Sequence, residues 1–322
     1  MAETLGKRRG RPPGSGRNSQ PAQRQAADAS PTLFDLAPYV TPEIHVKATQ
    51  PVPSTVFDTY WRFAALRQEL FFNRIRYPSR PPWTDDAILR KHKFTNAYRA
   101  SDRVSQYLIR EVIYADGDGL QQPEDVFFRT ILFKLFNKIE TWQLLRHHLG
   151  EVRWAEYTFD RYDRILGDAI GSGERIYSAA YIMPSGRSAF GHERKHSNHL
   201  RLVERMMADR LPDRLHQSRP PLGEVYETVL SYPGIGPFLA YQYAIDLNYG
   251  PLLDASENDF VMPGPGALDG IAKCFHDLGG YAPADVIRWT CDRQEASFAR
   301  LGLDFRDLWG RPLMLIECQN LF

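Results

Sequence analysis

The segment Leu230-Ser231-Tyr232-Pro233-Gly234-Ile235-Gly236-Pro237-Phe238-Leu239-Ala240 decides how this 322-residue chain is expected to fold. Apolar residues on both sides predict two helices, and the Pro-Gly pair between them predicts a tight turn. Gly234 and Gly236 permit left-handed backbone and close approach, while Ile235 can fill the space between the helices. Pro237 suits the first turn of the second helix, where its missing N–H costs no hydrogen bond. The segment therefore predicts a helix-hairpin-helix.

The turn of this hairpin is a candidate DNA-binding site. Backbone amides at the start of a helix attract anions, so those around Gly234, Ile235 and Gly236 suit a DNA phosphate. The alternative is an ordinary turn between two core helices. The small Ala240, which lets the two helices pack closely, favours DNA binding. We therefore predict double-stranded DNA as a partner.

Residues 1–32 are a second candidate DNA-binding element. They are rich in Gly, Pro, Gln and Ala with almost no large apolar side chain, so we expect them to be disordered in isolation. Arg8, Arg9 and Arg11 surround a Gly-Arg-Pro core that resembles an AT-hook, whose arginines enter a narrow A·T minor groove. A generic basic tail, which binds phosphate without groove preference, is the alternative.

The rest of the chain reads as one mainly helical domain. Residues 33–53 contain four prolines, which predicts an extended strap. Ser54 is a plausible N-cap for a helix with apolar residues at a period near 3.6, so we place the domain at 54–322. Further helices are expected at about 85–114, 123–149, 187–210, 221–231, 237–248, 266–278 and 283–301. Strand-like alternation is scarce, which makes the fold class mainly α.

Composition limits the kinds of binding site and the cellular location that we expect for the protein. The net charge of +1 leaves any attraction to DNA to local clusters. Cys274, Cys291 and Cys318 are too few and too far apart for a disulfide framework, a zinc knuckle or an iron–sulfur loop. No apolar run reaches the roughly 18–20 residues that span a bilayer. We expect a cytoplasmic, nucleoid-associated protein without membrane contact, cofactor, metal or an evident obligate protein partner.

Two resemblances make the fold more specific. Helix-hairpin-helix DNA glycosylases follow a hairpin of this form with a catalytic carboxylate further along the chain. The segment from about Val56 to Phe322 is similar to the helical family named for phage 5-hydroxymethyluracil DNA kinases and alpha-glutamyl/putrescinyl thymine pyrophosphorylases. The residues that carry this second likeness are Phe128-Arg129, Phe133 to Asn137, Ala180-Tyr181-Ile182, the hairpin through Asp246-Leu247, Asn258 to Val261, Gly264-Pro265-Gly266 and Gln319-Asn320. The implied fold is a helix-hairpin-helix DNA glycosylase-like helical domain, with the hairpin at 230–248.

Two departures from these families bear on the reaction. Phe238 stands where the resemblance to bifunctional glycosylases would place a Schiff-base lysine, so hydrolysis by water is expected in place of lyase chemistry. The sequence also contains no phosphate-binding Gly-x-x-x-x-Gly-Lys-Ser/Thr loop. We therefore do not expect this chain to be itself the kinase of its namesake family.

Three acids after the hairpin are candidates for the carboxylate that a glycosylase needs to stabilise an oxocarbenium-like sugar or to activate water. Asp259 is preferred, because the apolar Phe260-Val261-Met262 beside it predicts a partly buried carboxyl. Glu257 and Asp254 are the alternatives, and each of the three could instead be a helix cap or a solvated acid. Asp246 we interpret as a structural acid that pairs helices.

A polar strip opposite the core stripe of the helix expected at 123–149 is the candidate base pocket. It consists of Thr130, Lys134, Asn137 and Thr141. Large apolar residues flank the strip, which makes it narrower than a solvated face, the alternative interpretation. We predict a groove in which Lys134 and Asn137 meet a base edge. Tyr181, and after it Trp142, are candidates for stacking on an extruded base, with the core as the other place for either ring.

The histidines His192, His196 and His199 have a spacing that suggests a metal site. No acid or cysteine completes a ligand set, and Arg194, Lys195 and Arg201 lie among them. We therefore expect a basic, phosphate-facing helix and not a zinc site.

Three hypotheses for the function follow. The main one is a monofunctional DNA glycosylase that flips a hypermodified hydroxymethylpyrimidine out of DNA and hydrolyses its bond to the sugar, with a role in defence against phages implied by the family. The second is a base-hypermodification enzyme, a pyrophosphorylase-type transferase that acts on a phosphorylated hydroxymethylpyrimidine in DNA. The third is a non-catalytic adaptor that only binds DNA.

Overall fold

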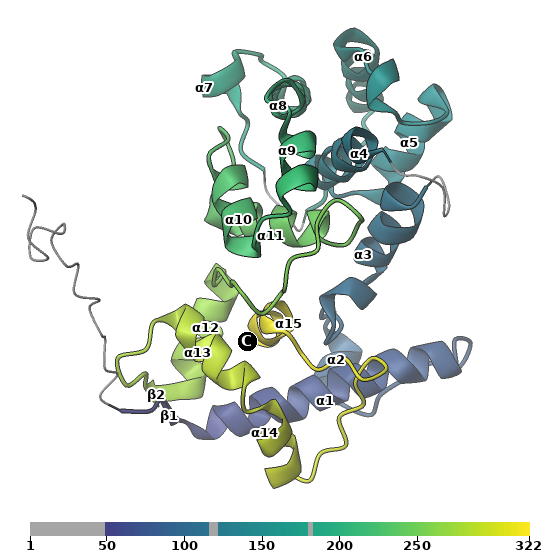
Figure 1. The fold of residues 1–322 in the computed structure, drawn as a ribbon. Helices are drawn as coiled ribbons and strands as arrows, with labels where there is room; N and C mark the ends of the chain where they lie inside the picture. The colour runs from purple at the N-terminus through teal and green to yellow at the C-terminus, as the bar shows by residue number, and fades with distance from the viewer. Residues whose placement is uncertain (1–48, 116–121, 180–182) are drawn as a thin grey trace, which may run out of the picture. The chain divides into compact units, whose positions relative to one another are not determined.

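A computed structural model describes residues 49–115, 122–179 and 183–322 of the chain, which divides into two units, residues 1–46 and 47–322. Arg8, Arg9 and Arg11 of the expected arm lie outside the described residues, as do Tyr181 and the strap up to residue 48. The second unit holds all of the elements described below (Figure 1).

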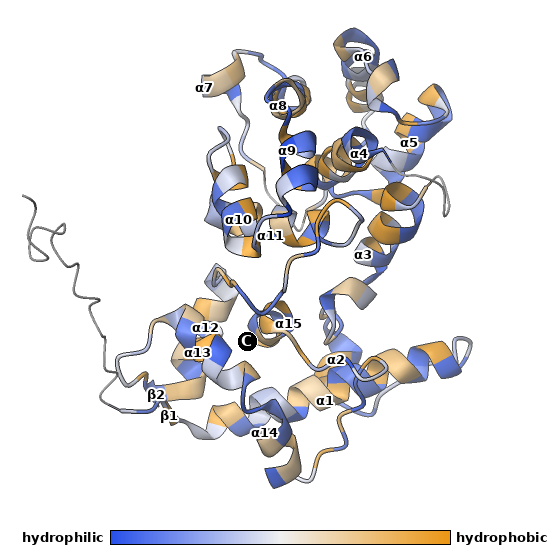
Figure 2. Ribbon diagram, in the orientation of Figure 1, coloured by the Kyte–Doolittle hydropathy of each residue, from blue (hydrophilic) through white to orange (hydrophobic). Residues whose placement is uncertain are grey.

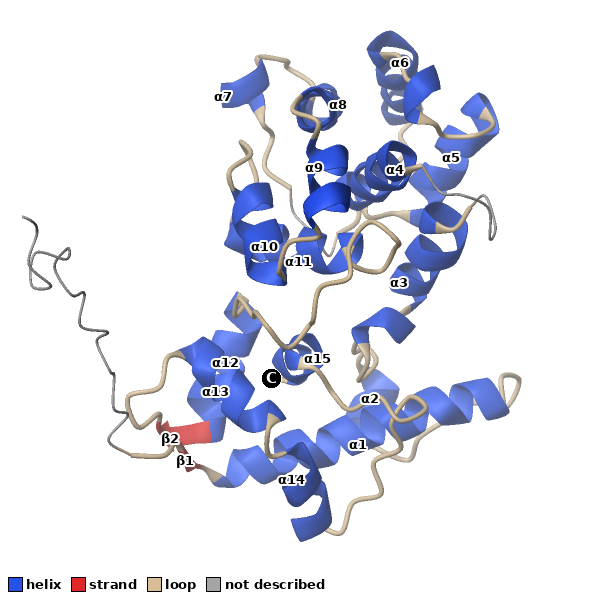
Figure 3. Ribbon diagram, viewed as in Figure 1, coloured by secondary structure: helices blue, strands red, loops and turns tan. Residues whose placement is uncertain are grey.

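This unit is mainly α-helical, as predicted (Figure 3). Its first half contains α1 (Thr55–Arg76), α2 (Ala87–Lys91), α3 (Arg103–Tyr107), α4 (Pro123–Phe136), α5 (Ile139–Leu149), α6 (Phe159–Gly171), α7 (Arg187–Phe190) and α8 (Lys195–Ala208). Its second half contains α9 (Leu211–Ser218), α10 (Leu222–Leu230), α11 (Pro237–Leu247), α12 (Pro265–Cys274), α13 (Pro283–Cys291), α14 (Gln294–Arg300) and α15 (Leu315–Leu321). Shorter helical segments are the 3-10 turns η1 (Arg99–Ser101) and η3 (Trp154–Glu156) and the π-helical η2 (Leu108–Ile113).

The β-structure of the described residues is one short antiparallel pair, β1 (Val52–Pro53) with β2 (Phe275–Asp277). Val52 pairs with Asp277, and the next residue but one, Ser54, donates its backbone N–H to the Cys274 carbonyl over 2.8 Å. The last residues of the expected strap are therefore tied to the end of α12.

Helix α1 begins where the sequence predicts. The Ser54 hydroxyl accepts a hydrogen bond from the Val56 N–H at 3.2 Å, which satisfies one of the free donors of the first turn. Phe57, Trp61 and Ala64 belong to its buried stripe, and hydrophobic and hydrophilic residues alternate along the helix (Figure 2). This stripe packs against α12 and α15, so the first and last helices of the domain share a core.

Four of the predicted helices are broken in the structure. The segment at 187–210 is α7 followed by α8, and the segment at 283–301 is α13 followed by α14. The segment expected as a helix at 123–149 is α4 followed by α5, because Asn137 adopts a left-handed backbone with φ of 49° and ends α4. Asparagine tolerates this conformation better than most residues. The segment at 85–114 is divided among α2, η1, α3 and η2. Helices α6, α9 and α15 were not predicted.

Helices α10 and α11 pack against each other and are joined by the tight turn expected from the sequence. Gly234 has φ of +79°, which favours glycine, and Gly236 is the extended N-cap of α11. Ile235 is buried between the helices and Ala240 is fully buried at their contact. The hairpin geometry is as predicted, while its role in DNA binding stays a prediction.

Candidate functional site

The polar strip on α4 and α5 is buried. The exposed fractions of Thr130, Lys134, Asn137 and Thr141 lie between 1% and 5%. The Thr141 hydroxyl donates to the Ile176 carbonyl over 2.8 Å, and Lys134 Nζ donates to Asn137 Oδ1 over 2.8 Å. The strip is therefore not a solvated face, and its groups are used inside the protein.

One buried carboxylate holds two cations at the junction of three elements. Asp246 of α11 is fully buried, with Oδ2 3.1 Å from Lys134 Nζ and Oδ1 2.8 Å from an Arg99 terminal nitrogen. Arg99, which lies on η1, also donates to Gln242 Oε1 at 3.1 Å and to the Tyr249 hydroxyl at 2.8 Å. Removing ions from water is costly, so such a cluster persists only with close partners. The cluster joins α4, α11 and η1, and Asp246 pairs elements as we interpreted it.

Lys134 determines which way the amide of Asn137 points. An ammonium group only donates hydrogen bonds, so the amide atom that faces it is the carbonyl oxygen Oδ1. Within the described part of the chain the Nδ2 group of Asn137 has no hydrogen-bond partner. Asn137 therefore offers two N–H donors whose orientation the buried cluster holds.

Asn137 lines a cavity of about 420 Å³, a size typical of small-molecule sites. The other lining residues are Arg103, Val104, Lys138, Ile139, Glu140, Arg175, Tyr177, Ser178 and Ala179. Lys138 Nζ is 3.4 Å from Glu140 Oε2. Ser178 is held at the cavity by its N–H, which donates to the Phe136 carbonyl over 2.9 Å. The lining combines amide donors with basic side chains, a chemistry that suits an acceptor-rich, anionic ligand.

Tyr177 is the aromatic wall of this cavity. Its ring packs on Phe136 with centroids 5.0 Å apart, and Lys195 Nζ lies 4.4 Å from the ring centroid. Burial lowers the pKa of His199 to about 4, so this imidazole is neutral at pH 7. His199 Nε2 is 2.8 Å from the Pro184 carbonyl, which only accepts, so Nε2 carries the proton and the Tyr177 hydroxyl donates to Nδ1 over 2.8 Å. The ring is therefore fixed from both sides.

The histidines of α8 do not form the phosphate-facing strip that we expected. His196 and His199 are buried, and His196 Nε2 lies 3.2 Å from Asp163 Oδ1. The basic neighbours in the sequence misled the prediction, because on this helix the histidines occupy the core-facing side. In the described ranges no group of three or more His, Cys, Asp or Glu side chains could hold a metal ion.

The three acids after the hairpin have different surroundings. Asp254 and Asp259 are exposed, so the partly buried carboxyl expected at Asp259 is wrong. The Asp259 backbone carbonyl, not its carboxylate, accepts a hydrogen bond from Arg288 at 3.2 Å. Glu257 has the buried setting: its side chain is 9% exposed, with Oε2 2.5 Å from an Arg311 terminal nitrogen. Burial raises the pKa of Glu257 and Arg311 opposes that rise.

A carboxyl that sequence reasoning missed lies beside this pair. Glu317 of α15 is 1% exposed and accepts a hydrogen bond from the Met314 N–H at 3.0 Å. Burial, and then the charge of Glu257, raises the pKa of Glu317 to about 7, while Arg311 lowers it. Buried carboxyls of this kind are typical of functional sites and of structural ion networks. The charges of Glu257 and Glu317 also raise the pKa of Tyr249, whose hydroxyl accepts a hydrogen bond from Arg99. The two glutamates therefore interact electrostatically with the cluster of Arg99 and Asp246.

Trp142 is not a wall of the candidate pocket. Its ring is 2% exposed and packs edge-on against Phe133 with centroids 6.0 Å apart. The expectation that it stacks on a base is therefore replaced by a place in the core. Tyr181, where we expected an aromatic wall, lies outside the described residues, whereas Tyr177, four residues before it, lines the cavity.

One sequence pattern indicates the buried cluster. Gln242 and Asp246 are polar residues four apart in the otherwise apolar stretch from Leu239 to Leu247, which places both on one helix face. A charged residue in such a helix needs a buried partner. Arg99 and Glu317 lie in short elements without periodicity, and nothing in their surroundings along the sequence indicates burial.

Comparison with known proteins shows the family to which the domain belongs. Residues 54–322 match the family model described as "5-hmdU DNA kinase, helical domain". The chain belongs to this family. A 5-hmdU DNA kinase of Bacillus phage SP10 is 26% identical over 264 residues, which cover 78% of this chain and 41% of that protein. The chain thus spans less than half the length of that relative.

Membership of the 5-hmdU DNA kinase helical-domain family confirms the narrower of the two resemblances. No solved structure matches the chain significantly, so the relation to helix-hairpin-helix glycosylases stays a prediction. None of the described helices combines the length and the hydropathy that crossing a membrane requires.

The prediction of a monofunctional DNA glycosylase is wrong. The family and the phage relative are both named as kinases, which transfer a phosphoryl group, and neither name describes hydrolysis of a base–sugar bond. The transferase alternative agrees better with these names. The role in oxocarbenium stabilisation that was assigned to Asp259, Glu257 and Asp254 is withdrawn with the hydrolase, and so is the defence role that rested on base excision.

Proposed function

We propose that this chain takes part in a transferase-type modification of DNA and that its helical domain binds a 5-hydroxymethylpyrimidine nucleotide of the DNA in the cavity at Asn137. Family membership supports the class of reaction. The observation that carries the position of the site is the oriented Asn137 amide, with Lys134 and Asp246 behind it and a cavity in front of it.

The chemistry of the cavity suits a pyrimidine. Uracil-type bases present carbonyl acceptors at O2 and O4, and either one can accept a hydrogen bond from the Asn137 amide N–H. Tyr177, whose ring packs on Phe136, lines the same cavity and offers an extruded base an apolar contact. Arg103 and Arg175 on the same lining suit the phosphates next to the base.

In the kinase reaction that we propose, the hydroxymethyl oxygen attacks the terminal phosphorus of a nucleoside triphosphate. The new O–P bond forms as the bond to the leaving diphosphate breaks, and the hydroxyl proton passes to a base or to solvent. The sequence of this chain lacks a phosphate-binding Gly-x-x-x-x-Gly-Lys-Ser/Thr loop. The part that we assign to the described domain is therefore to bind and orient the acceptor nucleotide.

The missing loop favours a second candidate within the same class. In a pyrophosphorylase-type transferase an amine attacks the methylene carbon of a pyrophosphorylated hydroxymethylpyrimidine, the C–N bond forms as pyrophosphate leaves, and no nucleoside triphosphate is needed in this step. The pocket of such a transferase must still recognise the modified pyrimidine, which the same Asn137 cavity would do.

Mass spectrometry of nucleosides separates these two reactions. The full chain is incubated with 5-hydroxymethyluracil duplex and a nucleoside triphosphate, and in parallel with duplex that carries the pyrophosphorylated base and an amine. A base that gains one phosphoryl group identifies the kinase, and an amine adduct with released pyrophosphate identifies the second candidate. Tighter binding of hydroxymethyluracil duplex than of thymine duplex is expected in both cases. Equal binding of the two duplexes together with no product in either reaction contradicts the proposal.

Asn137 provides the sharpest test of the site. We expect Asn137→Gly to keep the left-handed backbone without strain and to lower the free energy of unfolding by about 1–3 kcal/mol, because the buried Lys134 ammonium loses Oδ1 as an acceptor. The variant loses both amide donors, so modification of the base should fall by about tenfold or more, the loss expected for one hydrogen bond to a buried polar group. Melting temperature and product formation are measured together. Full activity of Asn137→Gly would remove this residue from the site.

A further inference from the structure

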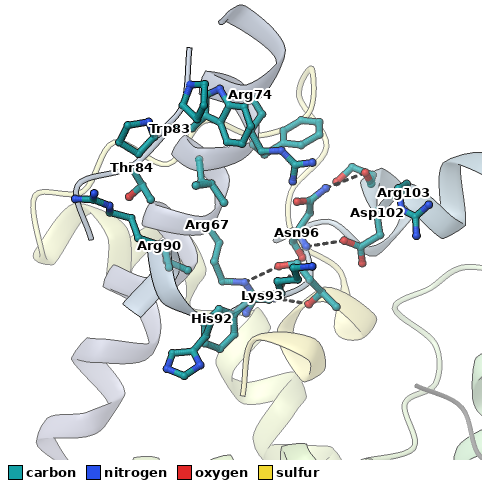
Figure 4. Close-up of a pocket in the computed structure, with 18 of the residues that line it drawn as sticks. Arg67, Arg74, Trp83, Thr84, Arg90, His92, Lys93, Asn96, Asp102 and Arg103 are labelled. Atoms are coloured by element: carbon teal, nitrogen blue, oxygen red, sulfur yellow. Dashed lines mark hydrogen bonds between the residues drawn. The ribbon is translucent and has the colours of Figure 1, made fainter. Parts of the chain in front are cut away.

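A cavity of about 800 Å³ borders α1, α2 and the segment 92–103 and has a basic lining (Figure 4). The basic side chains on it are Arg67, Arg74, Arg90, Lys93 and Arg103. None of these five forms an ion pair within the residues that the structure describes. The lining contains one acid, Asp102, which accepts a hydrogen bond from the Asn96 N–H at 2.7 Å and whose pKa is raised by burial. In a chain of net charge +1 this is a strong local excess of positive charge.

Arg67 places a cation at the buried side of this cavity. The residue is 4% exposed, and its guanidinium donates to the Thr95 carbonyl at 2.8 Å, the Thr95 hydroxyl at 2.5 Å and the Asn96 carbonyl at 3.3 Å. All of these acceptors are neutral. Burial lowers the pKa of Arg67 to about 10, so the group is charged at pH 7. Its charge is therefore not neutralised by a contacting carboxylate, which favours an anion in the cavity.

Aromatic rings lie among these cations. The Trp83 indole is held by its N–H, which donates to the Tyr77 carbonyl over 2.7 Å, and the Arg74 guanidinium lies 5.6 Å from its ring centroid. Phe94 is 46% exposed and packs edge-on against Phe63 with centroids 4.9 Å apart. Figure 4 shows Trp83 and Arg74 together at one end of the cavity and Arg103 at another. Cations with exposed flat rings are what single-stranded nucleic acid requires, because bases stack and phosphates need positive charge.

Arg103 lines both this cavity and the smaller cavity at Asn137. The two cavities therefore share one lining residue. A DNA strand whose nucleotide enters the Asn137 cavity can continue past Arg103 into the larger one.

We propose that the 800 Å³ cavity binds the nucleotides that flank the acceptor nucleotide on a single DNA strand, with phosphates on Arg67, Lys93 and Arg103 and a base against Trp83. The direction of the strand rests on the proposed function, since that function places the acceptor nucleotide at Asn137. Binding of the strand itself does not depend on the reaction. A site of this kind gives the domain affinity for an opened strand beside the modified base.

Two charge reversals on neighbouring lysines test the site in the full chain. Lys91 and Lys93 are both exposed, but only Lys93 lines the cavity. Binding of an unmodified, fluorescent single-stranded oligonucleotide is followed by anisotropy across a range of salt. We expect Lys93→Glu to weaken binding by about tenfold or more and to reduce the salt slope by about 0.7 for each lost phosphate contact. Lys91→Glu should bind like the wild type.

The aromatic part is tested with Trp83→Ala, which should weaken oligonucleotide binding by about 5- to 150-fold, the loss typical of one stacked base. Phe94→Ala, at a half-exposed ring, is the second variant if Trp83→Ala melts early. Equal losses in Lys91→Glu and Lys93→Glu would overturn the site. Thymidine monophosphate that binds as tightly as the oligonucleotide would overturn the assignment to a strand. If Lys93→Glu loses oligonucleotide binding but the wild-type protein modifies no base, the proposed function is refuted and this inference stands. If Lys93→Glu keeps both oligonucleotide binding and base modification, this inference is refuted and the proposed function stands.

Discussion

Asp246 pairs with both buried cations of the cluster, so its removal should strongly lower the stability of the fold. Asp246→Ala leaves Arg99 and Lys134 buried without the carboxylate that lies 2.8 and 3.1 Å away. Breaking a buried ion pair from one side costs about 3–5 kcal/mol, because a charge remains in a medium that solvates it poorly. We expect the free energy of unfolding, measured with denaturant, to fall by that amount.

Asp269→Ala is the matched control. Asp269 pairs with Lys273 at 2.5 Å, but both side chains are more than 60% exposed, so water replaces the lost partner. The expected change in the free energy of unfolding is about 0–1 kcal/mol. Similar losses in the two variants would show that the Asp246 cluster contributes no more than a surface pair.

Glu317 makes stability depend on pH in a stated direction. Its pKa in the folded protein is about 7, against an ordinary value of 4.5 in the unfolded chain, so the folded state holds the proton more tightly. Stability from this group is complete below pH 4.5 and is lost as the pH rises through 7. The loss is about 3 kcal/mol, since one pKa unit corresponds to about 1.4 kcal/mol.

Glu317→Gln should remove this dependence, because the amide does not ionise and still accepts the Met314 N–H. Denaturant unfolding between pH 5 and pH 8 measures it. We expect the variant to lose less stability than the wild type across this interval. Parallel pH profiles for the two proteins would show that Glu317 is already ionised at pH 5.

At the scale of elements, the turn between α10 and α11 can be tested with Gly234→Ala, and Gly266→Ala in α12 is the comparison with the opposite expected sign. Neither Gly234 nor Gly266 has an atom within 4 Å of an added Cβ, but Gly234 has φ of +79° whereas Gly266 lies inside α12. Gly234→Ala should lower the free energy of unfolding by about 1–2 kcal/mol because of left-handed strain. Gly266→Ala should raise it by about 0.5–1 kcal/mol. A stabilising Gly234→Ala would mean that the turn relaxes without strain.

The same elements show how far sequence reasoning reaches. Helix α1 and the α10–α11 hairpin were predictable, because a cap, a period near 3.6 and turn glycines act within a few residues of each other. The break between α4 and α5 was not, since Asn137 is held in its left-handed conformation beside Lys134 and Asp246, and Asp246 is far away in the sequence. The candidate site residues show the same difference between local and distant signals. Asn137 was predicted because it lies on a strip with helical periodicity, whereas Glu317 was missed because only tertiary contacts bury it.

At the scale of the whole molecule, we expect deletion of residues 1–32 to weaken binding of duplex DNA without changing the melting temperature of the helical domain. Arg8, Arg9 and Arg11 are the cations that the deletion removes from the expected arm. The dependence of affinity on salt should become shallower by up to about 0.9 per lost phosphate contact. Arg8, Arg9 and Arg11 replaced together by alanine should reproduce the effect most strongly on A·T-rich duplex. Unchanged affinity and an unchanged salt slope would exclude the arm from DNA binding.

The contact between α1 and α15 has a consequence for biosynthesis. The Tyr60 hydroxyl donates to the Cys318 carbonyl over 2.9 Å, although 258 residues separate the two in the chain. At the usual 5–20 residues per second, a ribosome needs roughly 13–50 s to synthesise that interval. During this time Phe57, Trp61 and their neighbours are outside the exit tunnel without the helix that covers them. This half of the domain therefore completes its core only after α15 has been synthesised, and until then its nascent form exposes apolar helix surface that a chaperone can shield.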